Sequence, residues 1–346
     1  MGGGVSWFIR AREASAAAFI FCLLAAFLQS FLTIPALAGT ETGEFCPTCP
    51  DWTNLEGWLA QKEAYENAQQ NGGPQSGQQN GQQNGQQNSH SADAAKATPP
   101  AEGYVLPELI ASAASVQSDQ VILDVRSKAD YQAGHISGAR NLYWKDLQKD
   151  GRLDNALAEE ALGRAGVNES DRLVLCGDSS EGAAYVFWAL SYLGHKNVSL
   201  LDGGADAARE SGIAFTANAP SPLPSNYTAR PVPWLLVTPE NLHSLLELAD
   251  VRVLDARDFS EYGRSRLGNL SICLSLDKLY DGSGIKDAAT LKDLFGRRLD
   301  ESGTQIVYGT PQAYSLFYSL RLMGYNATLL EGDWWKETER AVSNVR

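Results

Sequence analysis

The stretch RLVLCGDSSEGAAYVFWAL, residues 172–190, joins a short apolar run to a segment with the composition of a helix. The run ends at Cys176, and a polar loop leads from this cysteine into the helical segment. This loop consists of Gly177, Asp178, Ser179, Ser180, Glu181 and Gly182. Short apolar strands that alternate with helices are typical of a mostly parallel sheet with helices on both faces. The stretch therefore predicts an α/β fold with one cysteine where a strand meets a loop.

The same order of segments occurs twice after residue 104. The first copy contains VILDVR (121–126), LVLC (173–176) and VSLLDGG (198–204), and the second contains VRVLDAR (251–257), TQIVYG (304–309) and ATLLEGDW (327–334). Three landmark pairs are separated by 131, 130 and 129 residues: Asp124 and Asp255, Gly194 and Gly324, and Gly203 and Gly332. Such regular spacing indicates a duplicated domain. We therefore predict two α/β domains, at 104–217 and 218–346.

The amino-acid composition limits the kinds of partner that this chain can bind. Of its 346 residues, 44% are hydrophobic and 20% are charged, which is ordinary for a soluble protein. Its 41 acidic and 28 basic residues give a net charge of −13. Such a chain is repelled by phosphates unless it has a local basic patch, and the sequence contains no run of basic residues. We expect no nucleic-acid partner.

The N-terminal segment has the features of a targeting sequence. Arg10 and Arg12 precede an uncharged apolar run at 16–37, and Ala36-Leu37-Ala38 fits a signal-peptidase cleavage site. The run is also long enough to span a bilayer, so residues 1–38 are predicted to be either a signal peptide or an anchor. Either way we expect an extracytoplasmic protein, secreted or tethered to a membrane.

Asn-X-Ser/Thr sequons are frequent in the remainder of the chain. They lie at Asn168, Asn197, Asn226, Asn269 and Asn326. Their number favours a secreted protein whose loops accept glycans, although Asn, Ser and Thr are also simply common in loops.

Two further segments separate the targeting sequence from the predicted domains. Residues 39–68 contain Cys46 and Cys49 in Cys-Pro-Thr-Cys, which outside the cytoplasm is expected to form a local disulfide. A redox or metal role has less support, because no thioredoxin-like context and no second CxxC accompany it. Residues 69–103 are rich in Gln, Asn and Gly and contain Gly-Gln-Gln-Asn three times in tandem. This composition cannot bury a core and predicts a disordered linker that acts as a tether.

A family resemblance is carried by short motifs in both copies. Asp124-Val125-Arg126, Tyr131 and the run 134–141 (GHISGARN) resemble the N-terminal signature of rhodanese domains, and LGHKNVSLLDGG (193–204) resembles a later segment of the family. The second copy retains LDAR (254–257) and LEGDW (330–334) but has SRLG (265–268) in place of the GHI motif. The chain is similar to tandem rhodanese-domain proteins, the two-domain thiosulfate sulfurtransferases, over roughly residues 104–345.

The resemblance implies a fold, an activity and a site. The fold would be two rhodanese-like domains, each a mostly parallel sheet with helices on both faces. Cys176 would be the nucleophile, and the loop 177–182 would bind the substrate, a small sulfur-containing anion. The cysteine would pass sulfur as a persulfide to a thiol or cyanide acceptor, without a cofactor or a metal. Asp124, Arg126 and His135 are expected to be structural, with the histidine buried.

The sequence also contains evidence against such an activity. Asp178 and Glu181 place negative charge in the loop, which disfavours both a thiolate and an anionic substrate. The equivalent of Cys176 in the second copy is predicted to be Gly309, which has no thiol. A non-catalytic binding or scaffold module therefore remains the alternative to an exported sulfurtransferase. A third possibility is that Cys46 and Cys49 act as a dithiol acceptor.

Three other features have simpler interpretations. A rhodanese-related phosphatase would need an arginine at position 182, where this chain has glycine. Cys273, in LSICLSL (270–276), is expected to be a core thiol. Trp334 and Trp335 are expected to close the second core or the interface between the domains.

Overall fold

The computed structural model describes residues 63, 103–177, 180–268 and 271–336, without the side chains of residues 180 and 181. The predicted targeting segment 1–38, Cys46, Cys49 and almost all of the linker 69–103 lie outside these residues. The described residues from 103 onward belong to one compact unit. None of the described helices is both long enough and apolar enough to cross a membrane.

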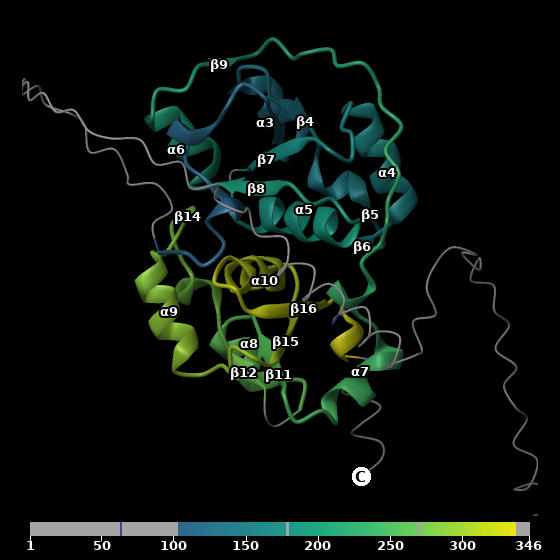
Figure 1. Ribbon diagram of the computed structural model, residues 1–346, viewed down its shortest axis with the longest axis vertical. Coiled ribbons are helices and arrows are strands. Elements are labelled where there is room, and N and C mark those ends of the chain that lie inside the picture. The colour runs from purple at the N-terminus through teal and green to yellow at the C-terminus, as the bar shows by residue number, and fades with distance from the viewer. Residues whose placement is uncertain (1–62, 64–102, 178–179, 269–270, 337–346) are drawn as a thin grey trace, which may run out of the picture. The chain divides into compact units, whose positions relative to one another are not determined.

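The first half of this unit is built on a five-stranded sheet in the order β1-β8-β7-β2-β4, with every pairing parallel (Figure 1). The strands are β1 (Ile110–Ala111), β2 (Gln120–Asp124), β4 (Arg140–Asn141), β7 (Arg172–Cys176) and β8 (Val198–Leu201). The central strands are buried apolar runs, as expected for a sheet with helices on both faces.

A second five-stranded sheet has the corresponding order, β10-β16-β15-β11-β12, and is also entirely parallel. Its strands are β10 (Leu236–Val237), β11 (Val251–Asp255), β12 (Ile272–Cys273), β15 (Thr304–Tyr308) and β16 (Asn326–Leu330). The predicted fold class, α/β with mostly parallel sheets flanked by helices, is thus confirmed.

Helices follow or precede most strands. They are α3 (Lys128–Ala133), α4 (Asn155–Arg164), α5 (Ser180–Tyr192), α6 (Gly204–Glu210), α7 (Pro239–Leu246), α8 (Phe259–Arg264), α9 (Ala288–Gly296) and α10 (Gln312–Leu322). Four of them begin with a side chain that accepts a hydrogen bond from the first turn, which stabilises the helix start: Ser127, Asp154, Asp258 and Asp287. Short 3-10 helices are η1 (Pro107–Leu109), η2 (Ala113–Ser115), η3 (Trp144–Leu147), η4 (Pro233–Leu235) and η5 (Leu276–Lys278).

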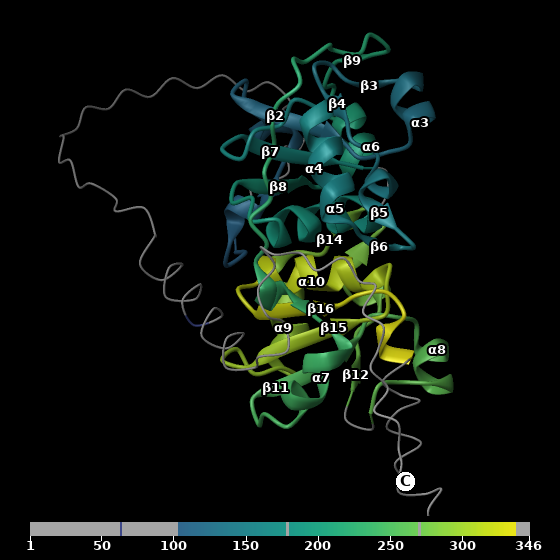
Figure 2. The same ribbon diagram turned by 90° about the vertical axis from the view of Figure 1, so that its right-hand side faces the viewer.

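The two halves share one large apolar core. Helices α5 and α10 lie side by side between the two sheets (Figures 1 and 2), and buried side chains of both belong to the same cluster. Trp188 of α5 donates a hydrogen bond from Nε1 to the carbonyl oxygen of Leu235 at 3.0 Å. A smaller apolar cluster lies on the other face of the first sheet, where α6 packs. The second half is therefore part of the same folded core as the first.

Three two-stranded antiparallel pairs complete the fold. They are β3 (His135–Ile136) with β9 (Phe215–Thr216), β5 (Gln148–Lys149) with β6 (Arg152–Leu153), and β13 (Tyr280–Asp281) with β14 (Gly284–Ile285). The hairpins β5–β6 and β13–β14 each contact a carboxylate of the opposite half. The backbone N–H of Leu153 donates to Glu331 at 2.9 Å, and that of Ile285 donates to Asp202 at 3.1 Å. Asp202 directly follows β8 and Glu331 directly follows the corresponding strand β16, so the halves exchange equivalent contacts.

Candidate functional site

The site predicted around Cys176 lies at the carboxyl edge of the first sheet. Cys176 is the last residue of β7 and is paired in register with Asp124, the last residue of β2. In the second sheet Tyr308 is paired in the same way with Asp255. The prediction that Gly309 is the counterpart of Cys176 is therefore wrong by one residue, because the register aligns Cys176 with Tyr308 and Gly177 with Gly309.

The Cys176 side chain faces the smaller apolar cluster. Side chains alternate between the faces of a strand, so Leu173 and Leu175 enter the large core while Val174 and Cys176 point to the α6 side. There Cys176 packs among apolar residues that include Ala205 and Leu201, and it is only 1% exposed. The thiol thus belongs to an apolar layer on the α6 side of the sheet.

The backbone after Cys176 is held by the turn that begins α6. The carbonyl oxygen of Gly177 accepts a hydrogen bond from the N–H of Ala205 at 2.8 Å. Gly204 adopts φ +59°, and a Cβ at this position would lie 2.1 Å from the oxygen of Gly177. Only glycine permits so close an approach of the two backbones.

The remainder of the predicted substrate loop is only partly described. Asp178 and Ser179 lie outside the described residues, and Ser180 already belongs to α5, which begins two residues before the Gly182 expected from the sequence. Gly182 is buried, and a Cβ there would lie 2.9 Å from the Trp144 ring. At this position the helix packs directly against η3.

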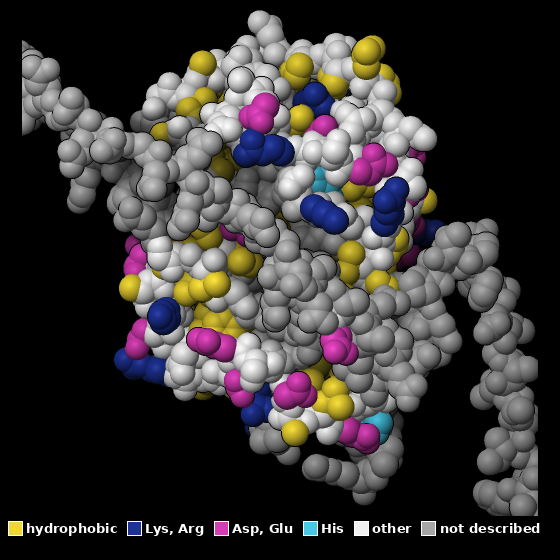
Figure 3. Space-filling view, viewed as in Figure 1, with side chains coloured by type: hydrophobic (Ala, Val, Ile, Leu, Met, Phe, Trp, Pro, Cys, Tyr) yellow, Lys and Arg dark blue, Asp and Glu magenta, His cyan; other side chains and the backbone are white. Residues whose placement is uncertain are grey.

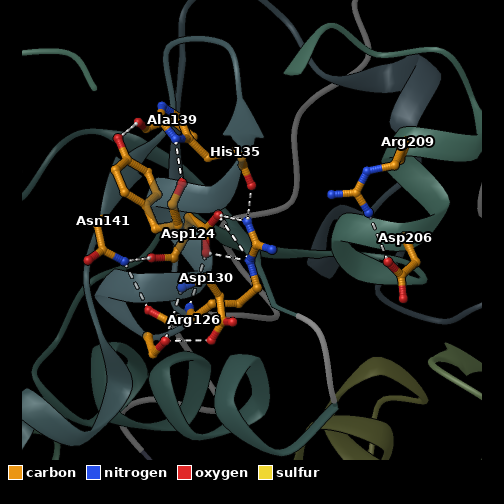
Figure 4. Close-up of polar contacts among 11 residues, drawn as sticks. Asp124, Arg126, Asp130, His135, Ala139, Asn141, Asp206 and Arg209 are labelled. Carbon is orange, nitrogen blue, oxygen red and sulfur yellow. Dashed lines mark hydrogen bonds and ion pairs between the residues drawn. The ribbon is translucent and has the colours of Figure 1, made fainter. Parts of the chain in front are cut away.

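Asp124 and Arg126 form a buried ion pair at the end of β2 (Figure 4). Arg126 Nη2 lies 2.6 Å from Asp124 Oδ2 and also donates to the carbonyl oxygen of Gly134 at 2.8 Å. Asn141, at the end of β4, donates from Nδ2 to the carbonyl oxygens of Asp124 and Arg126. Asn141 ends the run 134–141 that resembles the rhodanese signature, but the sequence assigns it no role in the site. Together these contacts hold the carboxyl edge of β2.

His135 is completely buried beside this ion pair. Its Nδ1 lies 2.8 Å from the carbonyl oxygen of Tyr131, and its ring stacks on the Tyr131 ring with a centroid distance of 3.7 Å. These contacts orient the turn between α3 and β3 and give the imidazole a packing role.

The second half repeats the ion pair, but here large side chains occupy the end of the central strand β15. Arg257 Nη2 lies 2.6 Å from Asp255 Oδ2 and also donates to the carbonyl oxygen of Ser265. The guanidinium stacks over the ring of Trp335 at 4.1 Å and lies 5.6 Å from the ring centroid of Tyr308. A Cβ at Gly309 would lie 2.6 Å from Arg257 Cγ, so this space is occupied. Side chains of the second half thus occupy the end of its central strand.

Two expectations about the second half can be compared with these contacts. Trp335 is 2% exposed in the core, and Trp334 carries the guanidinium of Arg152 from the first half 5.1 Å above its ring, so both tryptophans close the core and the interface as expected. Cys273 is half-buried and lies on the edge strand β12, with Sγ 3.5 Å from the carbonyl oxygen of Arg257. It is therefore less deeply placed than the core thiol that the sequence suggests.

The surface of the described residues carries both signs of charge. On the face shown in Figure 3, acidic and basic side chains are interspersed over both halves. Of the sequon asparagines, Asn168, Asn197 and Asn226 are exposed, while Asn326 is partly buried at the start of β16. Asn269 lies outside the described residues.

The fold and the arrangement of its first sheet are those of the rhodanese class. Residues 108–211 match the rhodanese-like domain family. The predicted recognition is thereby confirmed.

Individual relatives extend this similarity. The sulfur carrier protein TtuD of Thermus thermophilus is 33% identical over 36% of this chain, and the matched part covers 48% of TtuD, about half its length. A putative thiosulfate sulfurtransferase of Haloferax volcanii is 27% identical over 62% of this chain and 83% of its own length. The crystal structure of SseA from Escherichia coli, described as a 3-mercaptopyruvate sulfotransferase with the rhodanese fold, superposes with a TM-score of 0.58. It is 19% identical and covers 65% of this chain and 98% of SseA, which shows a shared fold.

Proposed function

We propose that this protein is a rhodanese-type sulfurtransferase that carries sulfur on Cys176. The observation that supports the proposal most directly is the position of Cys176 at the carboxyl end of β7, four residues before α5 begins. Peptide N–H groups at a helix start stabilise an anion such as a thiolate. Relatives named as thiosulfate sulfurtransferases support the same class of reaction.

The proposed reaction has two balanced steps. The Cys176 thiolate attacks the outer sulfur of a donor such as thiosulfate, the sulfur–sulfur bond of the donor breaks, and sulfite leaves with the electron pair. A cyanide or thiolate acceptor then attacks the outer sulfur of the Cys176 persulfide and restores the thiolate. No net oxidation of the protein occurs, and Tyr308 excludes the same chemistry from the second half.

A second candidate function is a non-catalytic binding or scaffold module. The burial of Cys176 favours it, because a thiol that is 1% exposed in an apolar cluster is poorly placed to meet a charged donor. The close contact of Gly204 with Gly177 also covers the backbone beside the thiol.

One experiment separates the two candidates. The purified chain is incubated with thiosulfate, and its intact mass is measured before and after the addition of cyanide. We expect the mass to increase by one sulfur atom and then return to its starting value. The Cys176→Ala variant should take up no sulfur, whereas the matched variant Cys273→Ala should behave like the wild type. Absence of uptake by the folded wild type would favour the binding module.

We also propose an extracytoplasmic location. The apolar segment 16–37 with its preceding arginines supports it, as do the exposed sequons at Asn168, Asn197 and Asn226. Cell fractionation with an epitope at the C-terminal end tests the location, and a chain found only in the cytosol would contradict it. The mass of the recovered protein reports whether residues 1–38 are removed.

A further inference from the structure

Three of the Asn-X-Ser/Thr sequons lie at the amino edge of the first sheet, opposite the edge where Cys176 ends β7. Asn197 directly precedes β8, and its carbonyl oxygen accepts a hydrogen bond from the N–H of Leu173, in β7, at 2.8 Å. Asn168 lies in the loop before β7, where its N–H donates to the Asp171 carboxylate at 2.9 Å. Because β7 and β8 are parallel, both loops lie where the two strands begin.

The connection between β9 and η4 brings the third sequon to this edge as it passes α4 (Figure 1). Tyr227, which follows Asn226, is buried, and its hydroxyl lies 3.3 Å from Nδ1 of His195 in the loop before β8. The N–H of Thr228 donates to Glu169, in the loop before β7, at 2.9 Å. Asn226 is therefore held beside the two loops that carry the other sequons.

The amide groups of these asparagines are accessible. All three residues are exposed, and within the described part of the chain the side chains of Asn197 and Asn226 form no hydrogen bond. Nδ2 of Asn168 lies 3.4 Å from the Asp171 carboxylate, which is also at the surface. N-glycosylation joins a sugar to this nitrogen in a surface sequon. One edge of the first sheet thus presents three acceptor nitrogens.

Asn326 begins a sequon of the same kind in a different environment. It is the first residue of β16, the strand of the second sheet that corresponds to β8, and it is partly buried. Its Nδ2 lies 3.5 Å from Oγ1 of Thr304, a buried residue of the neighbouring strand β15. A sugar on this nitrogen would have to displace the contact between the two strands, so the folded chain disfavours modification here.

We infer that Asn168, Asn197 and Asn226 carry N-linked glycans that together cover the amino edge of the first sheet, and that Asn326 stays unmodified. The inference rests on the proposed extracytoplasmic location, for which the apolar segment 16–37 is separate support. The glycans leave the opposite edge of the sheet uncovered.

The modification consumes a lipid-linked sugar phosphate. The asparagine amide nitrogen forms a bond to the anomeric carbon of the sugar, and the bond between that carbon and the phosphate oxygen breaks. The lipid phosphate leaves with the electron pair, and the amide nitrogen gives up one proton to a base of the glycosylating enzyme. No oxidation or reduction is involved.

The test uses the full chain recovered from cells of its own organism after fractionation, so that location and modification are measured on the same material. Its proteolytic peptides are analysed by tandem mass spectrometry, which assigns a sugar mass to an individual asparagine. We expect sugar on the peptides that contain Asn168, Asn197 and Asn226, and none on the peptide that contains Asn326.

Two substitutions at one exposed position separate the sequon from the surrounding structure. Thr228→Ala removes the hydroxyl that completes the sequon, so the glycan on Asn226 should be lost while those on Asn168 and Asn197 remain. Thr228→Ser keeps a sequon and should keep all three glycans. Both variants retain the backbone N–H that donates to Glu169, and thermal unfolding checks that each is folded.

The peptide masses and the cell fractions have distinct outcomes. Absence of sugar from any of the three asparagines, in protein recovered from outside the cytoplasm, overturns the inference and leaves the proposed location standing. Sugar on Asn326 also overturns it, as does a glycan on Asn226 that persists in Thr228→Ala. A chain found only in the cytosol contradicts the location, and the inference fails with it.

Discussion

The two halves of this protein differ most clearly at one pair of equivalent positions. Cys176 and Tyr308 end corresponding central strands, each in register with an aspartate that binds an arginine two residues further along the chain. In the first half the strand end carries a thiol, which packs in the smaller apolar cluster. In the second half Tyr308, Trp335 and the Arg257 guanidinium fill the same region.

This difference shows which parts of the fold are structural and which bear on chemistry. The ion pair and the parallel register are present in both halves, so they maintain the sheet edge whatever occupies the strand end. The proposed sulfur chemistry depends on a single side chain and on the space around it. A degenerate copy keeps the scaffold and loses the site, because the scaffold also supports the shared core.

The largest expected effect comes from the buried aspartate–arginine ion pair that both halves share. Asp124→Ala and Asp255→Ala each leave a buried arginine without its carboxylate, which should lower the free energy of unfolding by about 3–5 kcal/mol. The loss should be somewhat smaller for Asp255→Ala, because Arg257 keeps its stacking on Trp335. Urea denaturation followed by circular dichroism measures both. A loss below about 1 kcal/mol in either variant would contradict a structural role for the pair.

Replacement of Tyr308 by cysteine tests whether the second half can take up sulfur. Tyr308→Cys removes a ring that is fully buried, so it should destabilise the protein by about 3 kcal/mol through the cavity it leaves. The new thiol should take up no sulfur, because Arg257 and Trp335 occupy the surrounding space. Intact mass after incubation with thiosulfate, in a Cys176→Ala background, is the measurement. Uptake of sulfur would show that the thiol alone defines a site.

The buried carboxylate at the interface should make stability depend on pH. Burial raises the pKa of Glu331 to about 7, while hydrogen bonds from Leu153 and Tyr314 and the charge of Arg152 oppose the rise. The pKa of Glu331 is higher in the folded state than in the unfolded state. The contribution of this carboxyl to the free energy of unfolding is therefore fully present below about pH 4.5 and is lost as the pH rises toward 7.

Glu331→Gln removes this titration and keeps the oxygen that accepts from Leu153 and Tyr314. The difference in the free energy of unfolding between the variant and the wild type should grow in favour of the variant as the pH rises from about 4.5 to 7. It should reach about 3 kcal/mol by pH 8. Urea unfolding of both proteins at a series of pH values measures the difference. A difference that does not change with pH would contradict the assignment. Asp202, its counterpart in the first half, should show the same sign, because burial also raises its pKa.

The smallest effect is expected at the proposed nucleophile itself. Cys176→Ala keeps an apolar side chain among apolar neighbours, so it should cost only about 1 kcal/mol of stability. Cys176→Ser places a hydroxyl in the same layer and should cost more, about 1–3 kcal/mol, if the hydroxyl finds no partner. Thermal unfolding compares the two. Equal stability of both variants would indicate that water reaches the site, contrary to its burial.

Much of the fold could be predicted from local patterns. The apolar runs at VILDVR and LVLC, each followed by polar residues, identified the central strands, and their repetition with nearly constant spacing indicated two similar sheets. Asp124, Arg126 and His135 were recognised through a motif, and their buried contacts agree with the structural role expected of them. These features depend on residues that are close together in the chain, so a single sequence contains the relevant pattern.

The position of Tyr308 was misjudged because sequence spacing alone does not define register. Gly309, which directly follows Tyr308, was predicted as the counterpart of Cys176, whereas the pairing with Asp255 assigns Tyr308. Asn141 was part of the recognised run but was given no role, because its role depends on carbonyl groups at the end of the neighbouring strand β2 and just after it.

The amino-acid sequence by itself determined the α/β class, the repeated order of strands and helices, and the presence of one cysteine at a strand end. These follow from apolar periodicity and from the turn preferences of glycine, which act within a few residues. Only the tertiary structure decided that the Cys176 thiol faces the α6 layer, and that the two halves exchange contacts through Glu331 and Asp202. Those contacts join residues 178 and 83 positions apart, so they form only when both sheets have folded around their shared core.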